Sequence, residues 1–335
     1  MQKRALGSFQ VNPIGLGCMN LDHAYGPAVS AEQGERVLLG ALDAGYDFFD
    51  TATLYGASRN EERVGKVLAS QRSRFTLASK CGMAVVPIEG KSSRVIDGRP
   101  ATLRQQTEDS LRRLKTEVID LYYLHRWDKK VPIEDSVGAL SDMVRKGYVR
   151  SIGLSEVSAS TLRKAQAVHP IAAVQTEYSL WSRNPEIAVL QACQDLGVAF
   201  VAFSPVARGY LCGTLADPST LDAKDIRRSM PRFGSAHYAA NLKLLTPYKT
   251  MAQELGCTPA QLALAWLLHQ APHIIAIPGT TSVLHMRDNM AAANIVLSAE
   301  QMQQLGALIN QRTVSGPRYD AQATSEVDTE EFAPA

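Results

Sequence analysis

The sequence predicts an α/β protein folded as a single (β/α)8 TIM barrel. Short apolar runs alternate with helical periodicity eight times along the chain. The length of 335 residues is normal for one such barrel. Polar residues that lie far apart in the chain also share one position, just past a predicted strand. We expect a barrel domain over residues 1–312 and a C-terminal tail, partly disordered, over 313–335.

The predicted barrel strands are apolar runs bounded by Gly, Pro or charged residues, as buried parallel strands are. Before the first of them, residues 3–11 are expected to form a small N-terminal β-hairpin over the barrel floor. Helical periodicity fills the gaps between the strands. The strands are expected near residues 14–17, 47–50, 75–79, 119–124, 150–154, 172–176, 199–203 and 274–277.

Local signals mark three helix starts and one long loop. Ser30, Thr258 and Ser298 are each followed three positions later by Gln, which is the pattern of a capping box. About seventy residues separate the seventh and eighth strands, and the first part, roughly 207–236, has the Gly and Pro content of a loop. A loop this long is commonly functional or disordered.

Four polar side chains are predicted to meet at the mouth of the barrel. Asp50 ends one strand and Tyr55 lies five positions beyond it, while Lys80 and His125 close the next two strands. The carboxyl ends of barrel strands carry the chemistry in barrel enzymes. Each residue alone has a structural explanation, as a strand end, a rim charge or a packing residue. Their shared position indicates an active site.

These residue types suit the reduction of a carbonyl group. Addition of hydride leaves negative charge on oxygen, which then needs a proton, and the ordinary pKa of a tyrosine is about 10. A neighbouring Lys80 ammonium is expected to lower that pKa and make the Tyr55 proton easier to transfer. Asp50 would keep Lys80 charged and oriented. His125 could donate a hydrogen bond to the carbonyl oxygen.

The same residues resemble the signature of the aldo-keto reductase superfamily. The similarity is carried by Asp47–Gly56 (DFFDTATLYG), by Lys80, by Leu121–His125 (LYYLH) and by Ile152–Ser155 (IGLS). It extends from about residue 4 to residue 312. The resemblance implies a barrel that uses NADPH, with Tyr55 as acid/base and with Asp50, Lys80 and His125 completing a tetrad.

Two further motifs resemble one branch of that superfamily. These are Gln175–Leu180 (QTEYSL) and Ser204-Pro205 with Arg208-Gly209. They are similar to the branch that contains pyridoxal-reductase-like and potassium-channel-β-subunit-like members.

A phosphate site is predicted from the local sequence after the eighth strand. The chain has no Rossmann glycine loop, since Gly15-Leu16-Gly17 offers only G-x-G. Instead, the segment from Pro278 to Ser282 opens a helix, and backbone N–H groups at a helix N-terminus bind anions. Barrels commonly bind phosphate at this place.

The resemblance implies further contacts to the cofactor. Ser155 and Gln175 would hold the nicotinamide carboxamide, Phe203 would stack on its ring and Asn289 would meet the adenine. The long loop would fold over the cofactor, which makes Arg208 and the basic residues of the loop candidates for the pyrophosphate. The expected cofactor contacts are Asp50, Ser155, Gln175, Phe203, Ser204, Val206, Arg208, Gly209, Gly279, Thr280, Ser282, Asp288 and Asn289.

NADP(H) is the favoured cofactor, and NAD(H) stays an alternative. Many relatives place cations where this chain has Gly279, Ser282 or His285. A dianionic 2′-phosphate needs compensating charge. We therefore expect only a modest preference for NADPH over NADH.

The substrate pocket is expected to be lined by Met19, Tyr25, Met83 and Trp127, because each lies on a loop just beyond a barrel strand. Simple packing is the alternative for Met19 and Met83. Apolar walls around one oxyanion site suit small aldehydes or ketones. Arg318 and Tyr319 are expected near the barrel mouth, with disorder in the last residues.

Composition argues against several classes of function. The formal net charge of +2 gives no electrostatic case for nucleic acid or an anionic membrane. The five cysteines show no C-x-x-C and no metal spacing, which indicates reduced thiols and a cytoplasmic protein without a bound metal. The first residues lead into a polar turn rather than a signal core, and no run approaches the ~20 apolar residues of a membrane span. The expected partner is a small carbonyl compound.

Three classes of function stay open at this stage. The first is a carbonyl reductase, and the second is a redox-sensing subunit that binds a nicotinamide cofactor and turns over slowly. The third is a phosphate-sugar isomerase or aldolase with Lys80 as a Schiff base. The tyrosine partner of Lys80 and the long loop argue against the third. The sequence leaves the physiological substrate, reaction direction, stereochemistry and oligomeric state open.

Overall fold

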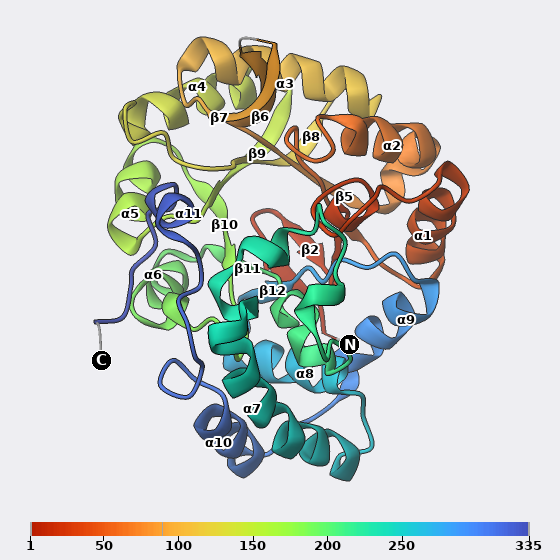
Figure 1. The fold of residues 1–335 in the computed structure, drawn as a ribbon. Helices are drawn as coiled ribbons and strands as arrows, with labels where there is room; N and C mark the ends of the chain where they lie inside the picture. The colour runs from red at the N-terminus through yellow and green to blue at the C-terminus, as the bar shows by residue number, and fades with distance from the viewer. Residues whose placement is uncertain (1, 89, 334–335) are drawn as a thin grey trace.

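The computed structural model describes residues 2–88 and 90–333 and is built around eight parallel strands curled into a barrel (Figure 1). The backbone N–H of Gly15 donates to the carbonyl of Ala276 at 2.8 Å, and parallel bridges join the first strand to the last. The expected (β/α)8 fold is confirmed. Around the sheet the strands are β12 (Ile274–Ala276), β11 (Ala199–Phe203), β10 (Ile171–Glu177), β9 (Val149–Ser155), β8 (Ile119–Leu124), β5 (Thr76–Cys81), β4 (Phe48–Asp50) and β3 (Leu16–Gly17).

Helices surround the strands, and two of them begin with the full capping box expected (Figure 1). At Ser30 the expectation of a full box is wrong. The Ser30 hydroxyl accepts from the Gln33 N–H, but the Gln33 side chain donates to the carbonyl of Thr281 at 2.6 Å. A tertiary contact therefore replaces the local one. The helices are α1 (Ala31–Asp43), α2 (Arg59–Leu68), α3 (Pro100–Leu114), α4 (Ile133–Arg145), α5 (Ala159–Val168), α6 (Val189–Leu196), α7 (Ser235–Glu254), α8 (Pro259–Gln270), α9 (Val283–Ala291), α10 (Ala299–Leu308) and α11 (Ala321–Ser325).

Large and small side chains alternate inside the barrel. Phe48 and Tyr123 are fully buried there beside Ala78 and Ala173. Gly153 on β9 is required by the close approach of the Tyr123 ring, which would collide with a Cβ at that position. The interior of the barrel is therefore a filled core.

Two antiparallel hairpins lie outside the barrel sheet. The expected floor hairpin consists of β1 (Arg4–Leu6) and β2 (Phe9–Val11), and Leu6 and Val11 are fully buried against the barrel core. A second hairpin, β6 (Met83–Ile88) with β7 (Lys91–Ile96), follows β5 and was not expected. Its second strand, KSSRVI, is polar and half-exposed, so it lacks the apolar run that marks a strand in sequence.

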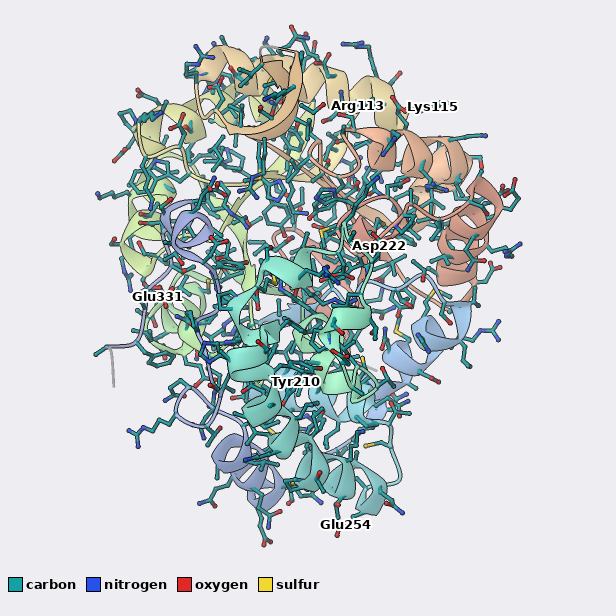
Figure 2. The ribbon with its side chains drawn as sticks, viewed as in Figure 1. Arg113, Lys115, Tyr210, Asp222, Glu254 and Glu331 are labelled. Atoms are coloured by element: carbon teal, nitrogen blue, oxygen red, sulfur yellow. The ribbon has the colours of Figure 1, made fainter. Side chains whose placement is uncertain are left out.

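The long loop before α7 is built of short 3₁₀ turns rather than irregular chain. Its basic residues bind neighbouring backbone: the Arg227 guanidinium donates to the carbonyl of Arg208 at 3.1 Å, and Arg232 donates to Trp181 and to Gly316. Tyr210 (Figure 2) belongs to the first of these turns and is fully buried. Its ring stacks on that of Trp181 with centroids 4.1 Å apart. These contacts give the loop a defined course over the barrel mouth.

The C-terminal tail runs back across the mouth and packs beside α5 and α6 (Figure 1). The Asp328 N–H donates to the carbonyl of Glu156 at 2.9 Å, and the Glu330 carboxylate accepts from the Ala159 N–H at 2.7 Å. The expectation of disorder in the last residues extends to 334–335, which lie outside the described residues. Over residues 2–88 and 90–333, no helix has the length and apolar character needed to cross a membrane.

We expect Gly65→Ala to lower the free energy of unfolding by about 1–3 kcal/mol, because a Cβ there would lie 2.6 Å from the backbone carbon of Leu114. Gly138→Ala in α4 is the matched control, since its Cβ meets nothing within 4 Å. That change should raise stability by about 0.5–1 kcal/mol through helix propensity. Urea unfolding followed by circular dichroism measures both, and equal effects would contradict the packing argument.

Candidate active site

The four residues expected to form a tetrad come together at the carboxyl ends of three neighbouring strands. The Lys80 Nζ donates to the Tyr55 hydroxyl at 3.1 Å and to the carbonyl of Thr51 at 2.9 Å, and it forms an ion pair with Asp50. The rings of Tyr55 and His125 meet edge to face with centroids 5.7 Å apart. Strand register explains the meeting, because Asp50 pairs with Ala78 on β5, two residues before Lys80.

Burial sets the ionisation of this cluster. The Lys80 side chain is 0% exposed, which disfavours the ammonium, but the charges of Asp50 and Tyr55 outweigh burial and raise the Lys80 pKa above its ordinary value. Gln175 donates to the second oxygen of the Asp50 carboxylate at 2.8 Å. Lys80 is therefore held as an ammonium with all its partners provided by the protein.

The net shift of the tyrosine pKa differs from the sequence expectation. Burial raises the Tyr55 pKa, and Lys80 opposes that shift without reversing it, so the pKa lies above its ordinary value. The expectation of a lowered pKa considered only the ammonium and left out the desolvation of the phenolate. Lys80 still brings the pKa down relative to an equally buried tyrosine without a cation.

His125 is neutral near pH 7. Burial lowers its pKa well below the usual value, and the charges of Arg126 and Lys80 lower it further. Its Nδ1 has no hydrogen-bond partner within residues 2–88 and 90–333. A neutral imidazole carries one N–H, so His125 can donate a hydrogen bond to an oxygen placed beside Tyr55.

A cavity of about 550 Å³ opens above these residues at the barrel mouth. Met19, Tyr25 and Met83 line it as expected for the substrate pocket. Trp127 does not line it: the indole N–H donates to the carbonyl of Val131 at 2.9 Å, and the side chain packs on the core. That placement corrects the expectation for Trp127, which rested only on its distance from the strand.

Most of the expected cofactor residues line the same cavity, namely Asp50, Ser155, Gln175, Phe203, Ser204, Val206, Arg208, Gly209 and Gly279. Four others lie outside its lining. The Ser282 hydroxyl caps α9, Thr280 accepts from the Ser282 N–H, the carbonyl of Asp288 accepts from Gln261, and Asn289 is buried. Thr280 precedes α9, Ser282 is its N-cap, and Asp288 and Asn289 lie within the helix.

Several lining residues were not expected, including His23, Arg94, Arg126, Gln322 and Glu326. Arg126 could have been found, because it directly follows His125 at a strand end. Arg94 lies on the unexpected hairpin, and Gln322 and Glu326 lie on the tail. Their approach to the cavity depends on tertiary packing that no local pattern encodes.

Glycines let the backbone come close at the mouth. A Cβ on Gly279 would lie 3.0 Å from the carbonyl oxygen of Gly17 and would collide with the Asn20 side chain. Arg208 and Gly209 follow β11 with φ of 55° and 91°, in the left-handed region. Backbone without a side chain at Gly279 and a sharp turn at Arg208 and Gly209 therefore border the cavity.

Arg208 is already held by a carboxylate. Its guanidinium lies 2.6 Å from the Glu177 carboxylate and 3.2 Å from the Tyr319 hydroxyl. Burial opposes ionisation of Glu177, but Arg208 and Arg318 outweigh it and lower the Glu177 pKa to about 2. The pair also brings the tail residue Tyr319 to the barrel mouth, as expected.

A second buried ion pair anchors the tail. Arg318 binds the carboxylate of Glu156, whose side chain is 0% exposed, and that carboxylate also accepts from the Glu177 N–H at 2.9 Å. Glu156 has a φ of 55°, in the left-handed region, where it points its side chain toward the tail. Glu156 and Glu177 thus join the strand ends of β9 and β10 to the C-terminal segment.

The comparisons with known proteins agree with this geometry. The Aldo/keto reductase family profile matches residues 13–310. The chain belongs to the aldo/keto reductase family. An aldo-keto reductase of Schizosaccharomyces pombe whose name specifies NADP(+) is 38% identical over 329 residues, 97% of this chain and 96% of the relative. A probable aldo-keto reductase of Glycine max is 38% identical over 93% of this chain and 89% of its own length.

Solved structures share the fold along their whole length. The glycerol dehydrogenase of Gluconobacter oxydans superimposes with a TM-score of 0.85 at 27% identity, covering 95% of this chain and 98% of the other. An aldo-keto reductase of Klebsiella pneumoniae in complex with NADPH gives a TM-score of 0.72 at 30% identity, over 96% of this chain and 99% of the other. The resemblance to the aldo-keto reductase superfamily is confirmed.

We expect Arg318→Met to lower the free energy of unfolding by about 3–5 kcal/mol, because it leaves the buried Glu156 charge without its partner. Arg94→Met is the matched control. The Arg94 side chain is 46% exposed and paired with Glu326, so its loss should cost at most about 1 kcal/mol. Chemical denaturation at neutral pH compares the two, and a loss at Arg318 as small as that at Arg94 would contradict the anchoring role.

Proposed function

We propose that this protein reduces aldehydes or ketones to alcohols with NADPH, and that Tyr55 is the proton donor. The observation that supports this most directly is the 3.1 Å hydrogen bond between the Tyr55 hydroxyl and a fully buried ammonium, at the base of the mouth cavity. Family membership supports the same chemistry. The NADP(+) in the name of the yeast relative and the NADPH in the Klebsiella complex support the choice of cofactor.

The residues at the mouth fit a nicotinamide cofactor. Ser155 and Gln175 are paired in register on β9 and β10, so a hydroxyl and a carboxamide face the cavity side by side. That donor and acceptor set suits the nicotinamide carboxamide. Phe203, at the end of β11, exposes its ring to the cavity. Gly17 and Gly279 have no side chains, so the backbone there leaves space in the cavity for a ligand. These residues would hold the reactive end of the cofactor.

The remaining chemistry is assigned to the chain's own residues. When bound, the nicotinamide cofactor would supply the hydride for the carbonyl carbon. Tyr55 donates its proton to the carbonyl oxygen, and the neutral His125 N–H orients that oxygen and stabilises its developing charge. Lys80 stabilises the phenolate that remains on Tyr55, and Asp50 keeps Lys80 in place. The Tyr55 proton is then restored from solvent.

The ion pair of Lys80 argues against an aldolase. A Schiff base needs a neutral amine that can reach its substrate. Lys80 is 0% exposed, and its pKa is raised by Asp50 and Tyr55 against the effect of burial. The lysine is therefore suited to charge stabilisation rather than to attack on a carbonyl.

The preference between NADPH and NADH is proposed to be modest. Ser282 caps α9, and His285 and Arg287 are exposed on that helix. A 2′-phosphate beside them would meet little fixed buried charge, and an exposed contact is screened by salt. The hydroxyl groups in the turn before α9 can still donate hydrogen bonds to a 2′-phosphate, which favours NADPH over NADH.

We expect Tyr55→Phe to lower the rate of carbonyl reduction by at least about 10²–10⁴-fold, because the general acid is removed. Affinity for NADPH should survive, since the phenyl ring keeps its packing. Tyr148→Phe, a change outside the cavity, is the control for loss of a tyrosine hydroxyl. Single-turnover absorbance of NADPH measures the chemical step, and a Tyr55→Phe enzyme as fast as wild type there would rule out the assignment.

We expect Lys80→Met to abolish most activity and to shift the remaining pH profile. Reduction needs protonated Tyr55, so the rate falls as pH rises through the Tyr55 pKa. Without the ammonium that pKa rises further, and the fall should move to higher pH. Asp50→Asn should lower the rate less, because the Lys80 side chain remains beside Tyr55, although its pKa falls without the Asp50 charge. A Lys80→Met enzyme with the wild-type pH–rate profile would show that the two groups are not coupled.

A further inference from the structure

We propose that the preferred substrates are carbonyl compounds that carry a carboxylate, and that Arg126 binds this carboxylate in the mouth cavity. The inference deepens the proposed function and rests on it, because it names the substrate class of the same site. It also assigns a role to a residue outside the tetrad.

The charges around the cavity single out Arg126. Four arginines line the cavity, and three of them are neutralised: Arg94 lies 2.5 Å from Glu326, Arg208 lies 2.6 Å from Glu177, and Arg227 lies 2.7 Å from Asp225. Arg126 has no carboxylate within 4.0 Å in the part of the chain that the structure describes. It brings an uncompensated positive charge to the reaction chamber.

The hydrogen bonds of Arg126 leave most of its donors available. One nitrogen, Nη1, donates to the carbonyl of His125 at 2.6 Å and to the Ser155 hydroxyl at 3.1 Å. Both acceptors are neutral. Within residues 2–88 and 90–333, Nη2 and Nε donate to no protein group. A guanidinium binds a carboxylate through two parallel N–H groups, so the free side of Arg126 matches that ligand.

Arg126 lies at the reacting end of the cavity. It follows His125 directly, and its charge acts on both neighbours, lowering the pKa of His125 after burial and opposing the rise in the Tyr55 pKa. The cations expected for the pyrophosphate, Arg208 and Arg227, instead come from the loop after β11. A ligand of Arg126 is therefore part of the substrate rather than the diphosphate of the cofactor.

A carboxylate suits this site better than a phosphate. Arg126 supplies one positive charge, and Met19, Leu54 and Met83 make apolar walls nearby. One guanidinium compensates a monoanion, whereas a dianionic phosphate needs more than one cation or a nest of N–H groups. The Ser155 hydroxyl can accept from Arg126 and donate to the nicotinamide carboxamide at once. Binding of substrate and of cofactor are thus compatible.

The reaction leaves the carboxylate unchanged. The carbonyl carbon gains a C–H bond from the cofactor hydride, which supplies both electrons, and the carbonyl oxygen gains a proton from Tyr55. The aldehyde or keto acid becomes a hydroxy acid, and NADPH becomes NADP⁺. Arg126 fixes the orientation of the acid and takes no part in the proton transfer.

The test compares acids with their methyl esters at saturating NADPH. Terephthalaldehydic acid and the semialdehyde of glutaric acid are each measured against the neutral ester, in wild type, Arg126→Met, Arg126→Lys and Arg94→Met. We expect wild type to favour the acids in kcat/KM by about ten- to a hundredfold, the range of one charge-assisted contact. Arg126→Met should remove this preference mainly through KM, Arg126→Lys should restore part of it, and Arg94→Met should retain it.

A binding titration supplies a readout without turnover. The hydroxy-acid product of the glutaric semialdehyde is titrated into the NADP⁺ complex and followed by tryptophan fluorescence, and Arg126→Met should weaken its binding by at least about tenfold. Equal kcat/KM for acids and esters in wild type, or equal binding by both enzymes, would overturn the inference and leave the proposed function intact. A stronger preference for glyceraldehyde phosphate over glyceraldehyde than for the acids over their esters would also overturn it. If no carbonyl compound is reduced, the proposed function fails, and the titration alone decides whether Arg126 binds carboxylates.

Discussion

The candidate active site depends on one buried charge, the Lys80 ammonium. It lies between Asp50 and Tyr55 at the carboxyl ends of β4 and β5, with no exposure to solvent. A buried lysine keeps its charge only when a partner compensates the loss of water, and Asp50 does this here. The same ion pair fixes the position of Tyr55. The location of the proposed proton donor therefore follows from the electrostatics of the barrel interior.

The cavity above this cluster is bordered by the loop after β11 and by the C-terminal tail, and both segments carry buried charges. Glu156 and Glu177 end two neighbouring strands, and Arg318 and Arg208 bind them from the tail and from the loop after β11. In each pair, the arginine compensates the charge of a carboxylate that is buried at the carboxyl end of a barrel strand. The tail and the loop are thus positioned by the strands, and with them the walls of the cavity. The two carboxylates act together with other contacts to the tail, such as that of the Ala159 N–H with Glu330.

The arginines that line the cavity differ in whether a carboxylate compensates their charge. Arg94, Arg208 and Arg227 line the cavity but are engaged with carboxylates. Among the described residues, Arg126 donates only to neutral oxygens, those of the His125 carbonyl and the Ser155 hydroxyl. An unpaired guanidinium attracts an anion more strongly than one whose charge a carboxylate already compensates. Selectivity for substrates would then come from the charge that the fold leaves uncompensated.

The sequence by itself determined the barrel and the residues of its candidate reactive centre. The eight strands and the tetrad follow from local patterns, because apolar runs mark buried parallel strands and strand ends share one face. Asp50, Lys80 and His125 could be placed this way because each is adjacent to a strand. The distances among them still required the register of β4, β5 and β8.

Only the tertiary structure decided which segments form the walls of the cavity at the barrel mouth. The hairpin of β6 and β7 is polar and half-exposed, so its pattern does not stand out, and Trp127 turned toward the core although its position suggested the pocket. The Gln33 side chain donates to the carbonyl of Thr281 on another loop instead of bonding to the Ser30 N–H as expected. The rise in the Tyr55 pKa likewise depends on burial, which is a property of the assembled molecule. Local sequence encodes strand ends, whereas contacts between distant loops and the desolvation of charges arise only when the chain is packed.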